Sequence, residues 1–440
     1  MALLNTDHSG LSRRPGARVA ADRATQDSLR KHNLAVVFTT IMAADPSALL
    51  SRADLAERTG LTKGTVSALV QQLIGLALVA EGPPEQPRGV GRPAIPLAPA
   101  GRTAVGLGLE VNVDYSGFRA IDLTGAIVAE QVERENFRGS DPEAVLGRLF
   151  RQARACAAAL EAEGMRIVGT GLALPGLADH PQGPLRLAPN LGWSETDIRS
   201  IAEKAATARE PGLPAPTQTK TAALVAYLTV DNEANFAARA ELLCRGAGRP
   251  ASFIYLSGAV GVGAALVIGG QVFSGGHGWA GEIGHTIVDP AGPRCACGAR
   301  GCLEQYAGTR AIVRAAGLPA DSGIDSLLDR LDRPAGDDGP CQAALTTAAR
   351  ALGIALASAV NLVDIPETVV GGDLMPLTKR LAPGILAELR ERVVAARWIG
   401  HDLVVRPAKS GRYAAMTGAA WHALSRVIAD PASLLSAPAA

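Results

Sequence analysis

The sequence predicts an α/β protein that begins with a small helical head. Two observations support this class. Before residue 100, apolar residues recur at the spacing of short helices, and from Ala104 onward short strands alternate with helices. Strands that are followed along the chain by helices indicate a sheet covered by helices. A chain of 440 residues, at roughly 150 residues per domain, has room for about three globular units. We therefore expect the head to be followed by an α/β body of two lobes.

The composition excludes a disordered chain and argues against a membrane protein. Hydrophobic residues make up 48% of the chain and charged residues 19%, as in folded proteins. A membrane span needs roughly 18 uncharged residues, and the most apolar helix candidate, 351–363, is too short for one. The first ten residues do not have the basic and apolar regions of a secretory signal. We expect a cytoplasmic protein with no membrane partner.

Local signals divide the head into three helices. Apolar residues on one helical face predict the first helix over 28–42. Ser51 and Asp54 form a variant of the capping box at the start of the second helix. Gly60 can end that helix in the left-handed conformation, and Thr62 then caps the third.

The second and third helices have the features of a helix-turn-helix. Ala56 is small where the two helices would touch, and Gly60 lies in the turn. The third helix exposes small or hydrogen-bonding side chains, which suit a major groove. A short strand over 76–79 and the Pro- and Gly-rich segment 82–102 then predict a wing and a linker. The expected DNA contacts on this helix and wing are Thr62, Lys63, Gly64, Thr65, Ser67, Gln71, Arg88 and Arg92.

A helical hairpin used only for packing is the alternative for this unit. The wing argues against it, because Arg88 and Arg92 lie on a Gly-flanked loop. Two such arginines can follow a phosphate backbone or enter a narrow minor groove, whereas a structural linker has little use for them. We interpret the unit as a winged helix-turn-helix.

A cysteine–histidine cluster predicts a metal site. His285, Cys295, Cys297 and Cys302 are separated by 10, 2 and 5 residues, with glycines between them. Three thiolates and one imidazole suit tetrahedral Zn²⁺ and leave no position open for water. A chance set of reduced thiols is one alternative, and an iron–sulfur cluster, disfavoured by the histidine, is another. We expect one structural zinc ion per chain.

The segment that contains this cluster, 276–308, resembles the central motif of the ROK family (repressors, unassigned reading frames and sugar kinases). The resemblance extends from the helix-turn-helix to the C-terminal TGAAWHAL. It implies a two-lobed, actin-like (ribonuclease H-like) ATPase fold with a sugar site in the cleft. Family members with an N-terminal winged helix are usually transcription regulators of sugar metabolism.

The resemblance and the local signals together give a division of the chain. We expect a mobile N-terminus at 1–24, the winged helix-turn-helix at 25–98, a linker at 99–103, lobe 1 at 104–230 completed by a C-terminal helix at 411–430, and lobe 2 with the zinc site and sugar cleft at 231–410.

The resemblance also implies a set of sugar-binding side chains. In the family they come from an Asn-Asp-Ala-Asn loop, a Glu-x-x-His motif and the glutamate after the third zinc cysteine. With the asparagine of APNLGW, the corresponding residues here are Asn190, Asn232, Glu233, Glu282, His285 and Glu304. Carboxylate, amide and imidazole groups pair well with sugar hydroxyls, and His285 would bind zinc through one ring nitrogen and a hydroxyl through the other. A solvated surface carboxylate is the alternative for each acid.

Three departures from the family kinases argue against catalysis. The kinases begin lobe 1 with Asp-x-Gly-Gly-Thr, but segment 108–113 here reads GLEVNV, and the branched Val111 and Val113 would obstruct a phosphate. The second phosphate loop, Gly-Thr-Gly in kinases, reads Ala-Val-Gly at 259–261. The base position holds Glu233 where kinases have Asp, which displaces the carboxylate. We expect no enzyme activity.

We therefore expect a sugar-responsive, DNA-binding transcriptional repressor with a catalytically degenerate, kinase-like cleft. Its partners would be operator DNA and a small sugar or sugar derivative, and we expect a homodimer or homotetramer. The enzyme alternative is an ATP-dependent sugar kinase with a regulatory DNA-binding head. A zinc-stabilised scaffold with neither ligand is the third alternative.

Overall fold

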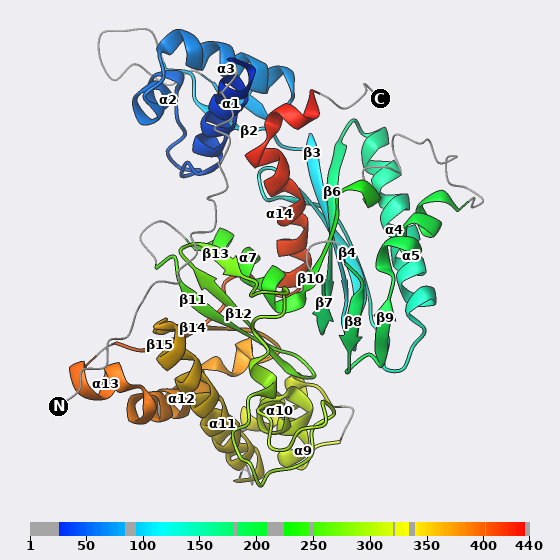
Figure 1. Cartoon of the computed structure of the whole chain (residues 1–440), viewed down its shortest axis with the longest axis vertical. Coiled ribbons are helices and arrows are strands. Elements are labelled where there is room, and N and C mark those ends of the chain that lie inside the picture. The colour runs from blue at the N-terminus through cyan, green and yellow to red at the C-terminus, as the bar shows by residue number, and fades with distance from the viewer. Residues whose placement is uncertain are drawn as a thin grey trace, which may run out of the picture.

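The computed structural model shows a head and two α/β lobes (Figure 1). It describes residues 26–83, 94–179, 183–208, 224–245, 250–319, 322–333, 339–400 and 402–435. The segment 1–24, expected to be a mobile N-terminus, lies outside these residues. The predicted α/β class is confirmed.

The head contains three helices and a two-stranded antiparallel sheet, in the order of a winged helix. These elements are α1 (Gln26–Met42), α2 (Arg52–Thr59), α3 (Lys63–Gly75), β1 (Val79–Glu81) and β2 (Leu97–Pro99). The capping box of Ser51 and Asp54 begins α2 as predicted, and Gly60 ends it with φ 72°. The predicted strand over 76–79 is wrong in its bounds, because Ala77 turns the chain out of α3 with φ 57°.

Lobe 1 is a five-stranded sheet with the strand order β10-β6-β3-β4-β5. Strands β3, β4 and β5 form the predicted antiparallel meander, and β6 and β10 continue the sheet in parallel. Its elements are β3 (Ala104–Val111), β4 (Ser116–Asp122), β5 (Ile127–Glu133), α4 (Pro142–Ala162), β6 (Arg166–Leu174), α5 (Ile198–Thr207) and β10 (Leu228–Asn232). Helix α4 packs on one face of this sheet, and α14 (Ala414–Ala429) packs on the other.

A small antiparallel sheet after β6 was not predicted from the sequence. It consists of β7 (Leu177–Ala178), β8 (Leu185–Ala188) and β9 (Trp193–Thr196). Strands of two to four residues are too short to show an alternating pattern of apolar and polar side chains. This sheet matters because it supplies one wall of the candidate site.

Lobe 2 is a second five-stranded sheet, with the order β13-β12-β11-β14-β15, covered by helices. Its strands are β11 (Phe253–Gly258), β12 (Val262–Ile268), β13 (Gln271–Phe273), β14 (Glu367–Gly372) and β15 (Val404–Pro407). Its helices are α7 (Glu233–Cys244), η1 (Ile283–His285), α8 (Glu304–Ala307), α9 (Thr309–Ala315), α10 (Ile324–Leu331), α11 (Gly339–Val363), η2 (Met375–Leu377), α12 (Thr378–Arg392) and α13 (Val394–Ile399). The last short helix, η3 (Pro431–Leu434), follows α14.

Helix α11 is longer than the apolar segment 351–363 suggested, because it begins at Gly339 and has 25 residues. Within the described part of the chain, it is the one helix long and apolar enough to cross a membrane. However, 61% of its most apolar stretch is buried inside the protein. Packing in the core of lobe 2 therefore explains its apolar character.

Helix α14 lies between the two lobes and touches both through backbone atoms. A Cβ atom on Gly108 of β3 would lie 1.9 Å from the carbonyl oxygen of Met416 in α14. On the other side of the helix, a Cβ on Gly418 would lie 1.7 Å from the carbonyl oxygen of Phe236 in α7. Such separations are impossible for real side chains, so these positions require glycine.

The same helix also supports the head. One hydrophobic cluster contains Leu34 and Phe38 of α1 together with Leu424 and Val427 of α14. Helix α1 also contacts η3, which directly follows α14. The head is therefore packed onto lobe 1, and the single helix α14 connects the contact between the lobes with the head.

The close contact between α14 and α7 makes Gly418 sensitive to substitution. We predict that Gly418→Ala lowers the stability by about 1–3 kcal/mol, because the added methyl group meets backbone that cannot move aside. In a helix interior, alanine is more favourable than glycine by about 1 kcal/mol. A net loss of stability in Gly418→Ala would therefore show that the clash with α7 outweighs this gain. The measurement is the midpoint of guanidinium unfolding. Gly276→Ala is the control, because nothing lies within 4 Å of its Cβ position, and equal midpoints for the two variants would contradict the prediction.

Candidate functional site

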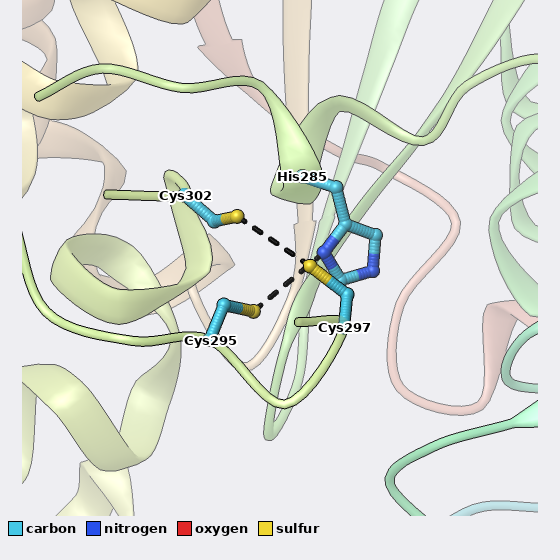
Figure 2. Close-up of side chains that lie close together, drawn as sticks. All are labelled: His285, Cys295, Cys297 and Cys302. Atoms are coloured by element: carbon cyan, nitrogen blue, oxygen red, sulfur yellow. Dashed lines mark hydrogen bonds between the residues drawn. The ribbon is translucent and has the colours of Figure 1, made fainter. Parts of the chain in front are cut away.

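The four predicted metal ligands come together in the structure (Figure 2). The ligand atoms of His285, Cys295, Cys297 and Cys302 all lie within 4.8 Å of one another. Cys295 Sγ is 3.8 Å from His285 Nδ1, and Cys297 Sγ is 3.7 Å from Cys302 Sγ. A tetrahedral ion with bonds of about 2.3 Å separates its ligands by about 3.8 Å. The group therefore has the chemistry and the spacing to hold a metal ion.

The loop fold accounts for this arrangement. Two glycines in the loop, Gly298 and Gly301, have φ values of 94° and 71°, which other residues rarely adopt. A Cβ on Gly301 would lie 1.6 Å from the carbonyl oxygen of Asp289, so the loop closes tightly there. Cys295 N–H donates to the carbonyl of Ala299, and a bridge joins Ile287 to Cys302. Local backbone contacts thus bring the three cysteines back to His285.

A cavity of about 200 Å³ lies beside the metal group, between the small sheet of lobe 1 and the loops of lobe 2. It is smaller than the roughly 300–1,000 Å³ of drug-sized pockets, so it suits a small ligand. All six side chains predicted to bind sugar line it: Asn190, Asn232, Glu233, Glu282, His285 and Glu304. Residues more than 110 positions apart in the sequence therefore face one space.

His285 belongs to both the metal group and the cavity. Its Nδ1 faces Cys295 Sγ, and its Nε2 lies 3.9 Å from Glu282 Oε2. Cys297 also lines the cavity, and Cys295 Sγ lies 4.0 Å from Glu304 Oε1. An ion held at Nδ1 would fix the tautomer and leave Nε2 to face a ligand.

Two of the predicted residues have structural partners that the sequence did not reveal. Asn232 caps α7, because its Oδ1 accepts from Ala234 N–H at 2.8 Å. Its amide nitrogen donates to the carbonyl of Gly176 at 3.0 Å. Glu233 Oε2 accepts from the amide of Asn112 at 2.8 Å. Asn112 was missed in the sequence analysis, although it lies in the segment that replaces the kinases' first phosphate loop.

Glu233 is the most perturbed carboxyl group in the cavity. Burial raises its pKa to about 8, and the negative charge of nearby Glu110 adds to the effect. Burial thus favours the protonated form of the Glu233 carboxyl group near neutral pH. A protonated carboxyl group can donate one hydrogen bond as well as accept others.

One of the three valines expected in the cavity wall lies elsewhere in the structure. Val113 and Val260 line the cavity, as expected for side chains that would obstruct a phosphate. Val111 does not, because it is fully buried in the core of lobe 1. That part of the obstruction argument is wrong: successive residues of β3 point to opposite faces, which turns Val111 into the core. Leu177 and Leu187 of the small sheet complete the wall.

Helix α3 presents most of its predicted DNA contacts to solvent. Lys63, Gly64, Ser67 and Gln71 are exposed, and Thr65 is half-buried. Thr62 and Thr65 also hold the helix start, because Thr62 Oγ1 accepts from Thr65 N–H and their hydroxyls lie 2.9 Å apart. Arg88 and Arg92 lie outside the described residues.

Comparisons with known proteins agree on one family. The ROK family profile matches residues 216–426. The chain is 27% identical to the xylose repressor of Bacillus spizizenii, over 90% of this chain and 96% of the repressor. It is 26% identical to the DNA-binding transcriptional repressor Mlc of Escherichia coli, over 90% of this chain and 93% of that protein. A glucokinase of Streptomyces coelicolor is 28% identical, over 71% of this chain and 97% of the kinase.

Solved structures give the same picture. The crystal structure of a ROK family transcriptional regulator, a homologue of the E. coli Mlc protein, has a TM-score of 0.69 and 25% identity. The match covers 92% of this chain and 98% of the regulator's chain. A ROK family glucokinase from Streptomyces griseus, in complex with glucose and AMPPNP, covers 73% of this chain with a TM-score of 0.58. The regulators thus match nearly the whole chain, and the kinases match about three-quarters of it.

Proposed function

We propose that this chain, which carries a ROK family domain over residues 216–426, is a sugar-responsive transcriptional repressor that acts in the cytoplasm. The observation that carries the proposal is the length of its similarity to the xylose repressor, which covers 90% of this chain and therefore must reach into the helical head. The six polar side chains around one small cavity support a sugar or sugar derivative as the effector. Operator DNA would bind the exposed face of α3 and the wing.

The cleft supports binding without phosphoryl transfer. Phosphate loops need small residues so that the backbone can approach the phosphate oxygens. Asn112 and Val113 stand in the first loop, and Asn112 bonds to Glu233, the residue at the base position. Val260 occupies the second loop where the kinases have threonine. We infer that the protein senses a sugar and does not phosphorylate it.

We propose Zn²⁺ as the ion of the metal group. Three thiolates and one imidazole are a common structural zinc set, and the spacing of the sulfur atoms fits it. The ion would keep His285 and Glu304 in place through the loop that carries the cysteines. Sugar binding would then depend on the metal without any contact between the two.

Helix α14 offers a route from the contact between the two lobes to the head. Its backbone touches lobe 1 and α7, and its C-terminal half shares a hydrophobic cluster with α1. A sugar that favours one arrangement of the lobes would shift the heads of a homodimer or homotetramer. By linkage, sugar and DNA would change each other's affinity by the same factor, typically about 5–150-fold.

The sugar proposal predicts that Glu282→Gln and Glu304→Gln weaken the response to sugar and preserve operator binding. Each change removes a charged hydrogen bond worth roughly 1.5–3 kcal/mol, or about ten- to a hundredfold in sugar affinity. The measurement is a titration of operator DNA with protein, with and without the best sugar from a thermal-shift screen.

Glu203→Gln is the matched control, because Glu203 is an exposed carboxylate on α5 outside the cavity. Cavity variants that respond at wild-type sugar concentrations would contradict the sugar site. Sugar-dependent release of ADP from ATP by the wild-type protein would instead support the kinase alternative.

The metal proposal predicts one zinc ion per chain, which is lost in Cys297→Ser. The loop that carries Glu304 should then loosen, and stabilisation by the sugar should disappear with the metal. Elemental analysis and thermal shift measure the two effects. Cys244→Ser, a change at an exposed cysteine outside the group, should keep both the zinc and the sugar response. Iron in the purified protein, or no metal, would contradict the assignment.

The DNA proposal predicts different effects for the wing and the helix. Arg92→Ala should lower affinity for all sequences and reduce the slope of log K against log salt by about 1, because a phosphate contact is lost. Gln71→Ala should alter base preference, because its exposed amide would face the major groove in the proposed complex. Gel-shift titrations at several salt concentrations measure both. Lys204→Ala removes a positive charge from α5, and an equal loss in this control would mean that Arg92 makes no specific contact.

A further inference from the structure

A second hollow lies between the two lobes, and none of its lining residues belongs to the sugar cavity. Its wall on lobe 1 consists of Asp179, which directly follows β7, and Arg186 of β8. Its wall on lobe 2 is the loop 274–279, between β13 and η1. The hollow measures about 540 Å³, within the roughly 300–1,000 Å³ of pockets for drug-sized ligands. We call it the outer hollow.

On lobe 1, a β-bulge brings the outer hollow beside the sugar cavity. Leu177 pairs with Leu187 and Ala178 pairs with Leu185, so Arg186 of β8 is the extra residue. A bulge interrupts the alternation of side chains along a strand and redirects them. Arg186 lines the outer hollow, and the adjacent Leu187 lines the sugar cavity. The two spaces therefore border on neighbouring residues of β8.

On lobe 2, one short segment borders both spaces. The loop 274–279 lines the outer hollow, and Glu282 lines the sugar cavity. Ala280 N–H donates to the carbonyl of Ser274 at 3.1 Å, which closes the loop. A Cβ on Gly281 would lie 2.0 Å from a carbonyl oxygen of β12, so the chain between the loop and Glu282 rests directly on the sheet. The loop is thus anchored beside the sugar cavity.

The outer hollow combines an aromatic pair with an ion pair. The ring centroids of His277 and Trp279 lie 5.0 Å apart, and the tryptophan is 39% exposed. Arg186 Nε donates to Asp179 Oδ2 at 2.8 Å. An aromatic ring offers a flat apolar surface to the C–H face of a sugar ring, while carboxylate and guanidinium groups form hydrogen bonds to its hydroxyl groups. This combination suits a sugar unit.

The charges of the outer hollow favour a neutral ligand over an anion. Arg186 is the one lysine or arginine among the described residues that line it. Its guanidinium already binds two carboxylates, because Nη1 also donates to Glu195 Oε2 at 3.0 Å. A phosphate group would have to compete with both carboxylates, whereas a hydroxyl group can join the existing pair as donor and acceptor.

We propose that the outer hollow binds a second sugar unit, so that the effector is a disaccharide or a longer oligosaccharide. This inference rests on the proposed function and specifies its ligand. One ring would occupy the sugar cavity, and the next would stack on Trp279 and form hydrogen bonds to Asp179 and Arg186. Trp279 belongs to lobe 2 and Arg186 to lobe 1. An oligosaccharide would therefore hold the lobes together through contacts that a monosaccharide cannot make.

The test compares monosaccharides with disaccharides that contain them, by isothermal titration calorimetry of the full chain. The panel is glucose with maltose and cellobiose, galactose with lactose, xylose with xylobiose, and N-acetylglucosamine with chitobiose. We expect one disaccharide to bind at least about tenfold more tightly than its monosaccharide, because the second ring adds stacking and hydrogen bonds.

The failure of this inference is distinguishable from the failure of the proposed function. Monosaccharide binding without any tighter disaccharide would overturn the second sugar unit and leave the sugar sensor standing. A panel in which no sugar binds would contradict both.

Variants locate the contact in the outer hollow. Trp279→Ala should lower the ratio of disaccharide affinity to monosaccharide affinity to about 1, and Arg186→Ala should also lower it. Trp398→Ala is the matched control for the first, because Trp398 is an exposed tryptophan of lobe 2 outside both spaces. Arg148→Ala is the control for the second, because Arg148 is an arginine of lobe 1 that also pairs with a glutamate. An unchanged ratio in Trp279→Ala and Arg186→Ala would overturn the proposal.

Tryptophan fluorescence separates direct stacking from an indirect effect. A sugar ring on Trp279 should change the emission of the wild-type protein more strongly with the disaccharide than with the monosaccharide. Trp279→Phe keeps an aromatic ring, so it should retain the preference for the disaccharide and lose this difference in emission. A difference that persists in Trp279→Phe would show that the second ring does not stack on this residue.

Discussion

The arrangement of the molecule depends on backbone contact around α14. Gly108 on β3 and Gly418 on α14 remove the side chains that would otherwise separate the helix from both lobes. At these contacts backbone meets backbone, and no flexible side chain lies between them. Helix α14 can therefore move only together with β3 or with α7. The helix also reaches the hydrophobic cluster of the head. A change in lobe arrangement would therefore reach the head as a rigid displacement of α14.

The metal group and the cavity are coupled through shared residues. His285 presents Nδ1 to the cysteines and Nε2 to Glu282, while Cys297 lines the cavity itself. An imidazole free to rotate would offer a ligand several weak geometries, whereas one fixed on its far side offers a single geometry. An ion held by the three cysteines would thus fix the orientation of His285 in the cavity.

The sequence was sufficient to predict those features that neighbouring residues determine. Caps at Ser51 and Thr62 and the turn at Gly60 depend on neighbouring residues alone, and the metal ligands lie within a short segment. It was insufficient where partners are distant. The bond from Asn112 to Glu233 spans 121 positions, and the direction of Val111 depends on which face of β3 meets the core. The strands β7 to β9 carry too few residues for any periodic signal.

The electrostatics of the cavity favour a neutral polyol over a nucleotide. Among the described residues that line it are Glu233, Glu282 and Glu304, but no lysine or arginine. Phosphate groups would meet carboxylates and branched side chains without a cationic partner, which is the reverse of a phosphoryl-transfer site. Hydroxyl groups, by contrast, can donate to carboxylates and accept from a protonated Glu233, whose pKa of about 8 favours that form. The polar residues that line this cleft are of the kinds that pair with sugar hydroxyl groups, which is the observation that supports the proposal of a sugar sensor over that of a kinase.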